Sequence, residues 1–236
     1  MKNQTEPIIS RRNFLVQGGT LLGAVALLGS TTLSGCGGKE DRADVTATEA
    51  LQRDHGVLQR ALLVLDEMGT RLKSDRDFPL PVLTGSLDLI RRFVLEYHEK
   101  LEEEHLFPRF EQAGKHVALV KILKEQHVAG GQVMDFLKAQ ANPPAMRKLV
   151  HRIQAAAYLR LFTRLYRPHA AQEDTVLFPL VRTVMAPKEF AVLGKKFRDA
   201  DAARFGADGF EKLVEEVAAL EKELGIYDFS QFTPKI

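Results

Sequence analysis

Two similar stretches of the sequence combine histidine and acidic residues at a spacing that suits metal binding. They run Glu96-Tyr-His-Glu-Lys-Leu-Glu-Glu-Glu-His-Leu-Phe-Pro108 and Arg167-Pro-His-Ala-Ala-Gln-Glu-Asp-Thr-Val-Leu-Phe-Pro179, and both follow the pattern His-x-x-x-Glu-[Glu/Asp]-x-x-Leu-Phe-Pro. Corresponding positions are 71 residues apart, which indicates duplicated structure. Residues four apart in a helix point in similar directions, so each stretch aims an imidazole and a carboxylate the same way. This is the chemistry of a metal ligand set.

Four helical segments are expected to position these residues. Apolar residues recur every three or four positions from residue 46 to about 74, from 82 to 112, from about 115 to 140, and beyond Asn142-Pro-Pro144. In the first and third segments, His55 and His127 replace an apolar residue of the stripe. The short links predict an all-α, antiparallel up-down four-helix bundle over residues 46–186. Because His169 lies too far from the start of the last segment, that segment is expected either to extend beyond the other helices or to begin with a separate turn around residues 143–151.

Residues 187–236 are expected to add a helical brace. Apolar residues at helical spacing occur in two groups, one near Phe190 and Phe197 and one near Leu213 and Leu220. No catalytic constellation occurs in this region, so its expected role is to pack on the bundle.

Charge and cysteine content exclude several classes of protein. The chain has 33 basic and 31 acidic residues, and removing residues 1–35 leaves 30 of each. A neutral protein is not suited to nucleic acid, whose phosphates require basic surface. The single cysteine, Cys36, excludes an internal disulfide and any cysteine-rich metal site.

The N-terminus has the order of an export signal. Ser10-Arg-Arg-Asn-Phe-Leu15 is followed by an apolar run to Leu33 and then by Leu33-Ser-Gly-Cys36. The arginine pair resembles a twin-arginine signal, and the last four residues resemble a lipobox. The resemblance implies a cleavable signal at residues 1–35, lipid on Cys36, and a linker over residues 36–45. The protein would then be tethered to a membrane of the cell envelope, on the periplasmic or outer side.

A metal centre explains the histidines better than a structural cluster does. One histidine in a helical stripe is ordinarily a hydrogen-bonded core residue, but here each of four helices supplies one. Unpaired, such groups would cost several kcal/mol apiece, on the order of the usual cost of burying polar groups. The doubled pattern resembles the hemerythrin-like, or HHE cation-binding, family over about residues 49–187. The resemblance implies two irons joined by an oxo or hydroxo bridge, with ligands His55, His98, Glu102, His127, His169 and Glu173.

The expected ligand set leaves coordination positions open. Two six-coordinate irons need about twelve positions, and these residues with one bridge fill roughly ten. Oxygen-carrying hemerythrins add a further histidine one turn after the ligand of the third helix, where this chain has Gly131, which argues against simple reversible oxygen carriage. Glu99 is either an additional ligand or a solvated helix residue. His105 is expected to be a neighbour of the site, and Glu103 and Asp174 are either hydrogen-bond partners of the ligands or solvated.

The expected function is therefore binding or sensing of a small molecule. Nitrogen-rich ligation suits dioxygen or a related small oxidant such as nitric oxide, and sensing would need an unidentified redox or signalling partner. A second hypothesis is an oxidoreductase acting on peroxide or nitric oxide, and a third is an iron-holding protein. The sequence does not decide whether the protein is an enzyme, and it shows no catalytic base.

Overall fold

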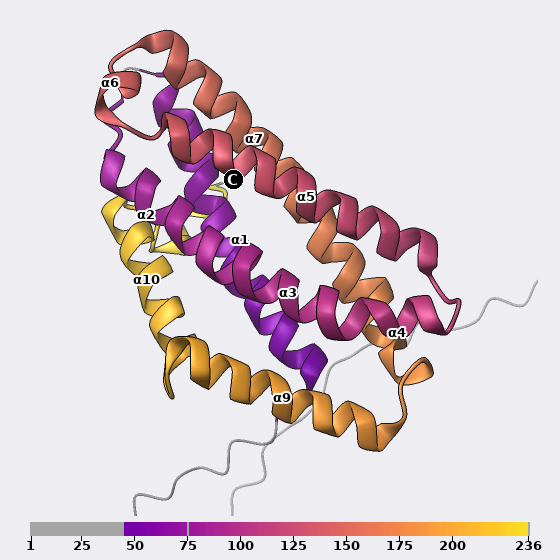
Figure 1. Ribbon diagram of the computed structural model, residues 1–236. Helices are drawn as coiled ribbons and strands as arrows, with labels where there is room; N and C mark the ends of the chain where they lie inside the picture. The colour runs from indigo at the N-terminus through magenta and orange to yellow at the C-terminus, as the bar shows by residue number, and fades with distance from the viewer. Residues whose placement is uncertain (1–44, 75, 236) are drawn as a thin grey trace, which may run out of the picture. The chain divides into compact units, whose positions relative to one another are not determined.

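The computed structural model describes residues 45–74 and 76–235, and this part of the chain is helical with no strand (Figure 1). The expected signal at residues 1–35, the lipidation site Cys36 and almost all of the linker lie outside the described residues. Within them, no helix combines the length and the apolar character needed to cross a membrane.

The first long helix, α1 (Ala47–Leu72), begins at a capping box. The Thr46 side chain accepts a hydrogen bond from the backbone N–H of Glu49, and the Glu49 carboxylate accepts one from the backbone N–H of Thr46 at 2.8 Å. Two otherwise unpaired donors of the first turn are thereby satisfied. The start of the helix agrees with the sequence prediction.

The second segment is helical without a break from Leu80 to Gln112, but it is not a uniform α-helix. It consists of α2 (Leu80–Ile90), the π-helix η1 (Arg91–His98), α3 (Glu99–Leu101), the π-helix η2 (Glu102–Leu106) and α4 (Phe107–Gln112). The fourth segment contains one π-helix, in the order α7 (Leu149–Gln172), the π-helix η3 (Glu173–Leu177), α8 (Phe178–Leu180) and the 3-10 helix η4 (Val181–Thr183).

A wide turn begins at the motif glutamate in both stretches and ends just before a Phe-Pro pair. Pro108 and Pro179 have no backbone N–H to offer the carbonyl four residues earlier, and their rings crowd the preceding turn. A local π-turn is one way for a helix to accommodate such a residue. The duplicated Leu-Phe-Pro therefore accounts for the duplicated wide turn.

The third segment, α5 (Val117–Gln140), is followed by a separate short helix. In α6 (Pro143–Met146), Asn142 caps the first turn by accepting a hydrogen bond from the backbone N–H of Ala145 at 3.0 Å. Helix α7 then begins at Leu149. The separate turn expected around residues 143–151 is thus present as α6 and its link to α7.

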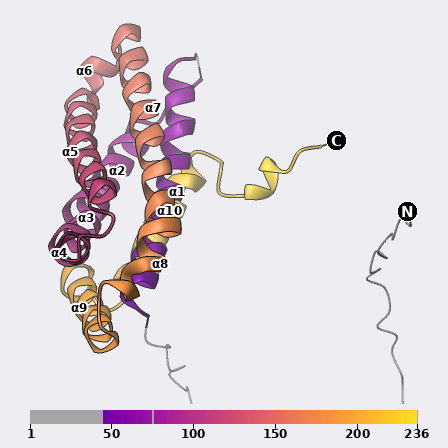
Figure 2. The ribbon, with the colours of Figure 1, turned by 90° about the vertical axis from the view of Figure 1, so that its right-hand side faces the viewer.

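The long helices run side by side (Figure 2), and their buried apolar side chains form one core. α1 contacts α7 and α2, and α5 contacts α7 and α4. Large side chains that are almost completely buried fill the space between them, among them Phe93, Phe107, Phe110, Phe162 and Tyr166. Full burial of each such aromatic side chain is worth roughly 1.5–3 kcal/mol of transfer free energy.

Two further helices, α9 (Pro187–Phe205) and α10 (Gly209–Glu223), pack on this core, and η5 (Phe229–Phe232) follows them. α9 and α10 both contact α1, and α10 also contacts α2. Arg60 of α1 donates to Glu221 of α10 at 2.9 Å. The C-terminal helices therefore pack against α1, and α10 also packs against α2.

Candidate metal centre

The structure brings the six predicted ligand residues into one buried cluster. The cluster has two halves, and in each half two histidines and both glutamates offer ligand atoms that lie within 4.8 Å of one another. The glutamates belong to both halves, so they have the position of bridging ligands. The first half contains His55 and His98, the second contains His127 and His169, and the shared residues are Glu102 and Glu173.

The histidines of each half converge through their Nε2 atoms. In the first half, Nε2 of His55 lies 3.1 Å from Nε2 of His98. In the second half, the corresponding distance between His127 and His169 is 3.2 Å. The members of each pair come from different helices, so four helices supply one imidazole each.

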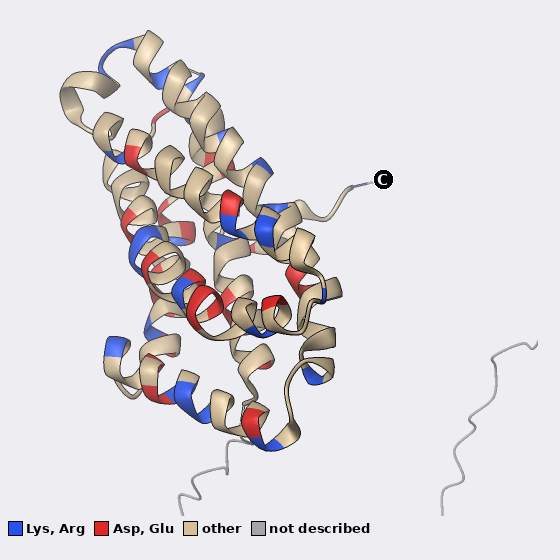
Figure 3. Cartoon of the chain, turned by 45° about the vertical axis from the view of Figure 1, so that its right-hand side comes forward, with Lys and Arg blue, Asp and Glu red and all other residues tan. Residues whose placement is uncertain are grey.

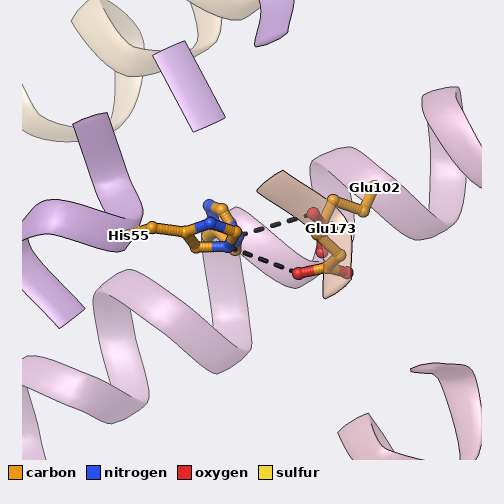
Figure 4. A group of neighbouring side chains, drawn as sticks. His55, Glu102 and Glu173 are labelled. Atoms are coloured by element: carbon orange, nitrogen blue, oxygen red, sulfur yellow. Dashed lines mark hydrogen bonds and ion pairs between the residues drawn. The ribbon is translucent and has the colours of Figure 1, made fainter. Parts of the chain in front are cut away.

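The two glutamates lie close to both histidine pairs, and Figure 4 shows them facing His55. Glu173 places Oε2 at 3.3 Å from Nε2 of His55 and at 3.2 Å from Nε2 of His169. Glu102 presents one oxygen to each half. Its Oε1 lies 3.6 Å from Nε2 of His98, and its Oε2 lies 3.6 Å from Nε2 of His127. Both carboxylates can therefore span two cations.

The carboxylates lack the partners that buried oxygens normally have. Glu102 and Glu173 are both 0% exposed, and none of their four carboxylate oxygens has a hydrogen bond. An ionised carboxylate left this way in an apolar core costs several kcal/mol, on the order of the usual penalty for an unpaired buried charge. A pair of cations between the histidine pairs would remove that cost. The residues present thus fit a two-metal centre.

Each histidine is oriented through its other ring nitrogen. Nδ1 of His55 lies 2.9 Å from Asp174, and Nδ1 of His127 lies 2.9 Å from Glu103. Such contacts fix the ring orientation and leave Nε2 for the metal. Asp174 and Glu103 each directly follow a bridging glutamate, so the duplicated [Glu/Asp] of the motif orients the lone histidine of another helix. Glu103 and Asp174 are therefore hydrogen-bond partners of the histidines rather than solvated residues.

The motif histidines have partners that sequence reasoning missed. Nδ1 of His98 lies 3.1 Å from Asp54, and Nδ1 of His169 lies 2.9 Å from Gln126. Asp54 directly precedes the ligand His55, and Gln126 directly precedes His127. The polar residue that precedes each of His55 and His127 in the sequence is thus the signal that could have predicted these two partners. Asp54 also borders a cavity of about 190 Å³ whose other walls include residues of α9 and α10.

The phenylalanines of the two stretches close the centre on its apolar side. Phe178 stacks on the ring of His55, and Phe107 stacks on the ring of His127, in both cases with 5.6 Å between ring centroids. Both side chains are buried. They exclude water from the imidazoles and thereby strengthen the electrostatic interactions within the site.

Glu99 is buried beside the second half of the centre, so the solvated alternative was wrong. It is 3% exposed, and its Oε1 accepts a hydrogen bond from the Tyr166 hydroxyl at 2.6 Å. One oxygen of Glu99 lies within 4.8 Å of ligand atoms of Glu103 and His127. Gly130 makes room for Tyr166, since a Cβ at that position would lie 2.1 Å from the tyrosine oxygen.

The remaining positions singled out in the sequence lie outside the centre. His105 packs its ring against Phe197, with 6.0 Å between centroids, and belongs to none of the clusters with metal-ligand spacing in the described part. His116 precedes α5 in a left-handed backbone conformation. Gly131 has no neighbouring atom within 4 Å of where a Cβ would stand.

Burial and mutual proximity shift the pKa values of the ligands in opposite directions. Burial, with Glu173 and Glu99 nearby, holds the pKa of Glu102 well above its ordinary value. Burial also opposes ionisation of Glu173, but the nearby imidazoles of His169 and His55, at 3.2 and 3.3 Å, hold its pKa below the ordinary range. Burial, reinforced by the neighbouring His55, lowers the pKa of His98. The cluster therefore favours a neutral imidazole at His98, as metal ligation requires.

Metal binding is expected to release at least one proton near pH 7. The raised pKa of Glu102 favours the protonated carboxyl in the metal-free protein, and this group must ionise to become a ligand. The apparent affinity for metal should therefore rise with pH, and it should level off at the pH where Glu102 is already ionised in the metal-free protein. Calorimetric titration with Fe(II), in two buffers of different ionisation enthalpy, counts the protons released.

Glu103→Gln provides the control for this measurement. A hydrogen bond from His127 lowers the pKa of Glu103 to about 2, so its carboxyl has no proton to release. The number of protons released should stay the same in this variant. Metal binding without proton release in the unsubstituted protein would contradict the protonated state of Glu102.

Comparisons with known proteins agree with this geometry. The family model described as hemerythrin HHE cation binding domain matches residues 46–181, which contain all six cluster residues. Three uncharacterized proteins, one from Mycobacterium bovis and two from strains of Mycobacterium tuberculosis, are each 40% identical to the chain over 241 residues, covering 99% of it and 94% of the relative. No solved structure matches. Since the family model covers more than half of the sequence, the chain belongs to the hemerythrin HHE cation-binding domain family.

Proposed function

We propose that this protein is an envelope-anchored non-haem di-iron protein that binds or senses dioxygen or a related small oxidant. Its core would be an antiparallel four-helix bundle of the hemerythrin type, braced by α9 and α10. The observation that carries the proposal is the pair of fully buried glutamates with unpartnered oxygens, each shared by two converging histidine pairs. Membership of a cation-binding family supports the same interpretation.

The donor set favours iron over other common metals. Four imidazoles and two carboxylates are ligands of intermediate softness, whereas magnesium and calcium prefer oxygen ligands throughout and structural zinc prefers four-coordinate sites rich in cysteine. Sharing of both glutamates between the halves supports two adjacent metal positions rather than one. Two irons so held would supply reversible one-electron changes and open positions for a small ligand.

Glu99 decides how many positions stay open. Its place beside His127 suits an additional ligand of the second half, while its Oε1 accepts a hydrogen bond from the Tyr166 hydroxyl. The first half has no comparable extra carboxylate among the described residues. We therefore place the open position for a small oxidant on the half formed by His55 and His98.

Metal analysis and an optical spectrum test the proposal. Protein purified without air should contain about two irons per chain and should develop oxo-bridge absorption when exposed to dioxygen. Zinc, a single iron, or no metal would contradict the di-iron assignment. Sustained consumption of peroxide or nitric oxide with an electron donor would favour the oxidoreductase hypothesis, and loss of metal without loss of the biological role would favour a structural scaffold.

The envelope anchor is a separate part of the proposal. It rests on the order of the arginine pair, the apolar run and Leu33-Ser-Gly-Cys36 in the sequence. Mass spectrometry of the mature N-terminus should find cleavage before Cys36 and added lipid on its sulfur. An uncleaved or unlipidated N-terminus in the native host would exclude this anchor, and it would leave the di-iron assignment untouched. No nucleic-acid partner is expected.

A further inference from the structure

A cavity of about 700 Å³ lies between α1 and α7, and none of the six cluster residues lines it. Its charged lining is mostly basic, since Lys73, Arg160, Arg164 and Arg167 face a single acidic residue, Asp66. Leu65, Gly69 and Ala156 contribute an apolar part of the wall. On the side of the molecule shown in Figure 3, basic and acidic positions are otherwise mixed along the helices.

Two of these arginines differ from most others in the described part of the chain. Arginine side chains there generally have an acidic, carbonyl or aromatic partner, as Arg60 does with Glu221 and Arg53 with the ring of Phe210. Arg160 and Arg164 have no such partner among residues 45–74 and 76–235. Both nevertheless line the same cavity, which concentrates unneutralised positive charge there.

The spacing of the arginines along α7 is unfavourable unless an anion is bound. Arg160 and Arg164 are four residues apart, and Arg167 follows three residues later, so the three guanidinium groups share one side of the helix. Like charges at these spacings destabilise a helix. Asp66 of α1 neutralises Arg167 by an ion pair across the cavity but leaves the other two charges.

We propose that this cavity is a binding site for a phosphate-bearing anion. Guanidinium groups bind phosphate oxygens in pairs, which gives both strength and geometric fit. Residues 160, 164 and 167 span about 10 Å along the helix, at 1.5 Å per residue, which suits a ligand with more than one phosphate. The volume is in the range of small-molecule sites, and the apolar wall gives space for an organic portion. The inference is independent of the metal centre.

Calorimetry with inorganic tripolyphosphate tests the site directly. Saturable binding is expected, weakening as salt is raised. Arg160→Ala and Arg164→Ala should each reduce affinity by about tenfold or more, because each removes a charge-assisted contact. Arg147→Ala is the matched control: Arg147 is also exposed and without a side-chain partner among the described residues, but it does not line the cavity. The affinity of the Arg147→Ala variant for tripolyphosphate should change by less than about twofold.

Asp66→Asn gives a prediction of opposite sign. Removing this charge frees Arg167 from its ion pair and should tighten binding by about threefold.

Flotation with vesicles then distinguishes a free phosphate compound from a lipid headgroup, using Cys36→Ser protein so that no attached lipid contributes. Arginine-dependent binding to phosphatidylglycerol but not phosphatidylcholine vesicles assigns a headgroup, and binding of tripolyphosphate alone assigns a free compound. No binding of either probe, or equal loss in Arg147→Ala, would overturn the proposal.

Discussion

Replacing either His98 or His169 by alanine is expected to abolish metal binding. Each residue supplies one of only two imidazoles in its half of the cluster. Nε2 of His98 lies 3.1 Å from Nε2 of His55, and Nε2 of His169 lies 3.2 Å from Nε2 of His127. Loss of a residue that merely orients a ligand already costs about 10- to 100-fold in metal affinity, so loss of the ligand itself should exceed that range. Elemental analysis of each purified variant should find well under one iron per chain.

The outcome should be local to the site, and His105→Ala is the control. His105 lies only seven residues beyond His98 and in the same helical segment, but its ring packs on Phe197 of α9 and faces no ligand. This variant should retain about the same metal content as the unsubstituted protein. Circular dichroism of all three variants establishes that they are folded. If the His105 substitution alone removed the metal, the assignment of ligands would be wrong.

The residues of the buried cluster could be identified in the sequence because their chemistry is repeated at helical spacing. A histidine and a glutamate four residues apart, twice in one chain, require only local geometry to be recognised. His55 and His127 were found because each interrupts an otherwise apolar stripe. The capping box at Thr46 and the separate helix α6 were predictable for the same reason, since nearby residues determine both.

Features that depend on contacts between helices could not be predicted in the same way. Asp54 and Gln126 reach histidines on other helices, and this depends on how the helices are rotated about their axes. The π-helical turns at Glu102 and Glu173 differ from an α-helix by a small local change in register that apolar periodicity does not reveal. Glu99 follows His98 directly, and only the hydroxyl of Tyr166 on α7 shows why it is buried.

The two adjacent glycines of α5 should respond in opposite ways to substitution by alanine. At Gly130, a Cβ would lie 2.1 Å from the hydroxyl oxygen of Tyr166 and 2.7 Å from its Cζ. Tyr166 cannot easily move, because it is 1% exposed, packs on Phe162 and donates to Glu99. Overpacking of this kind typically costs about 1–3 kcal/mol, and loss of the buried hydrogen bond adds roughly 1 kcal/mol. After the gain of roughly 0.8–1 kcal/mol that alanine brings to a helix, Gly130→Ala should therefore lower the free energy of unfolding by about 1–3 kcal/mol.

Gly131→Ala is the matched control, since a Cβ there meets no atom within 4 Å. Alanine favours a helix over glycine by roughly 0.8–1 kcal/mol, so this variant should be as stable as the unsubstituted protein or slightly more so. Tyr166→Phe in the Gly130→Ala background should restore part of the lost stability, because it removes the atom in closest conflict. Urea unfolding of the metal-free variants measures all three effects. Equal stability of the two single glycine variants would show that Tyr166 is not held against α5, and the position assigned to Glu99 would then lose its support.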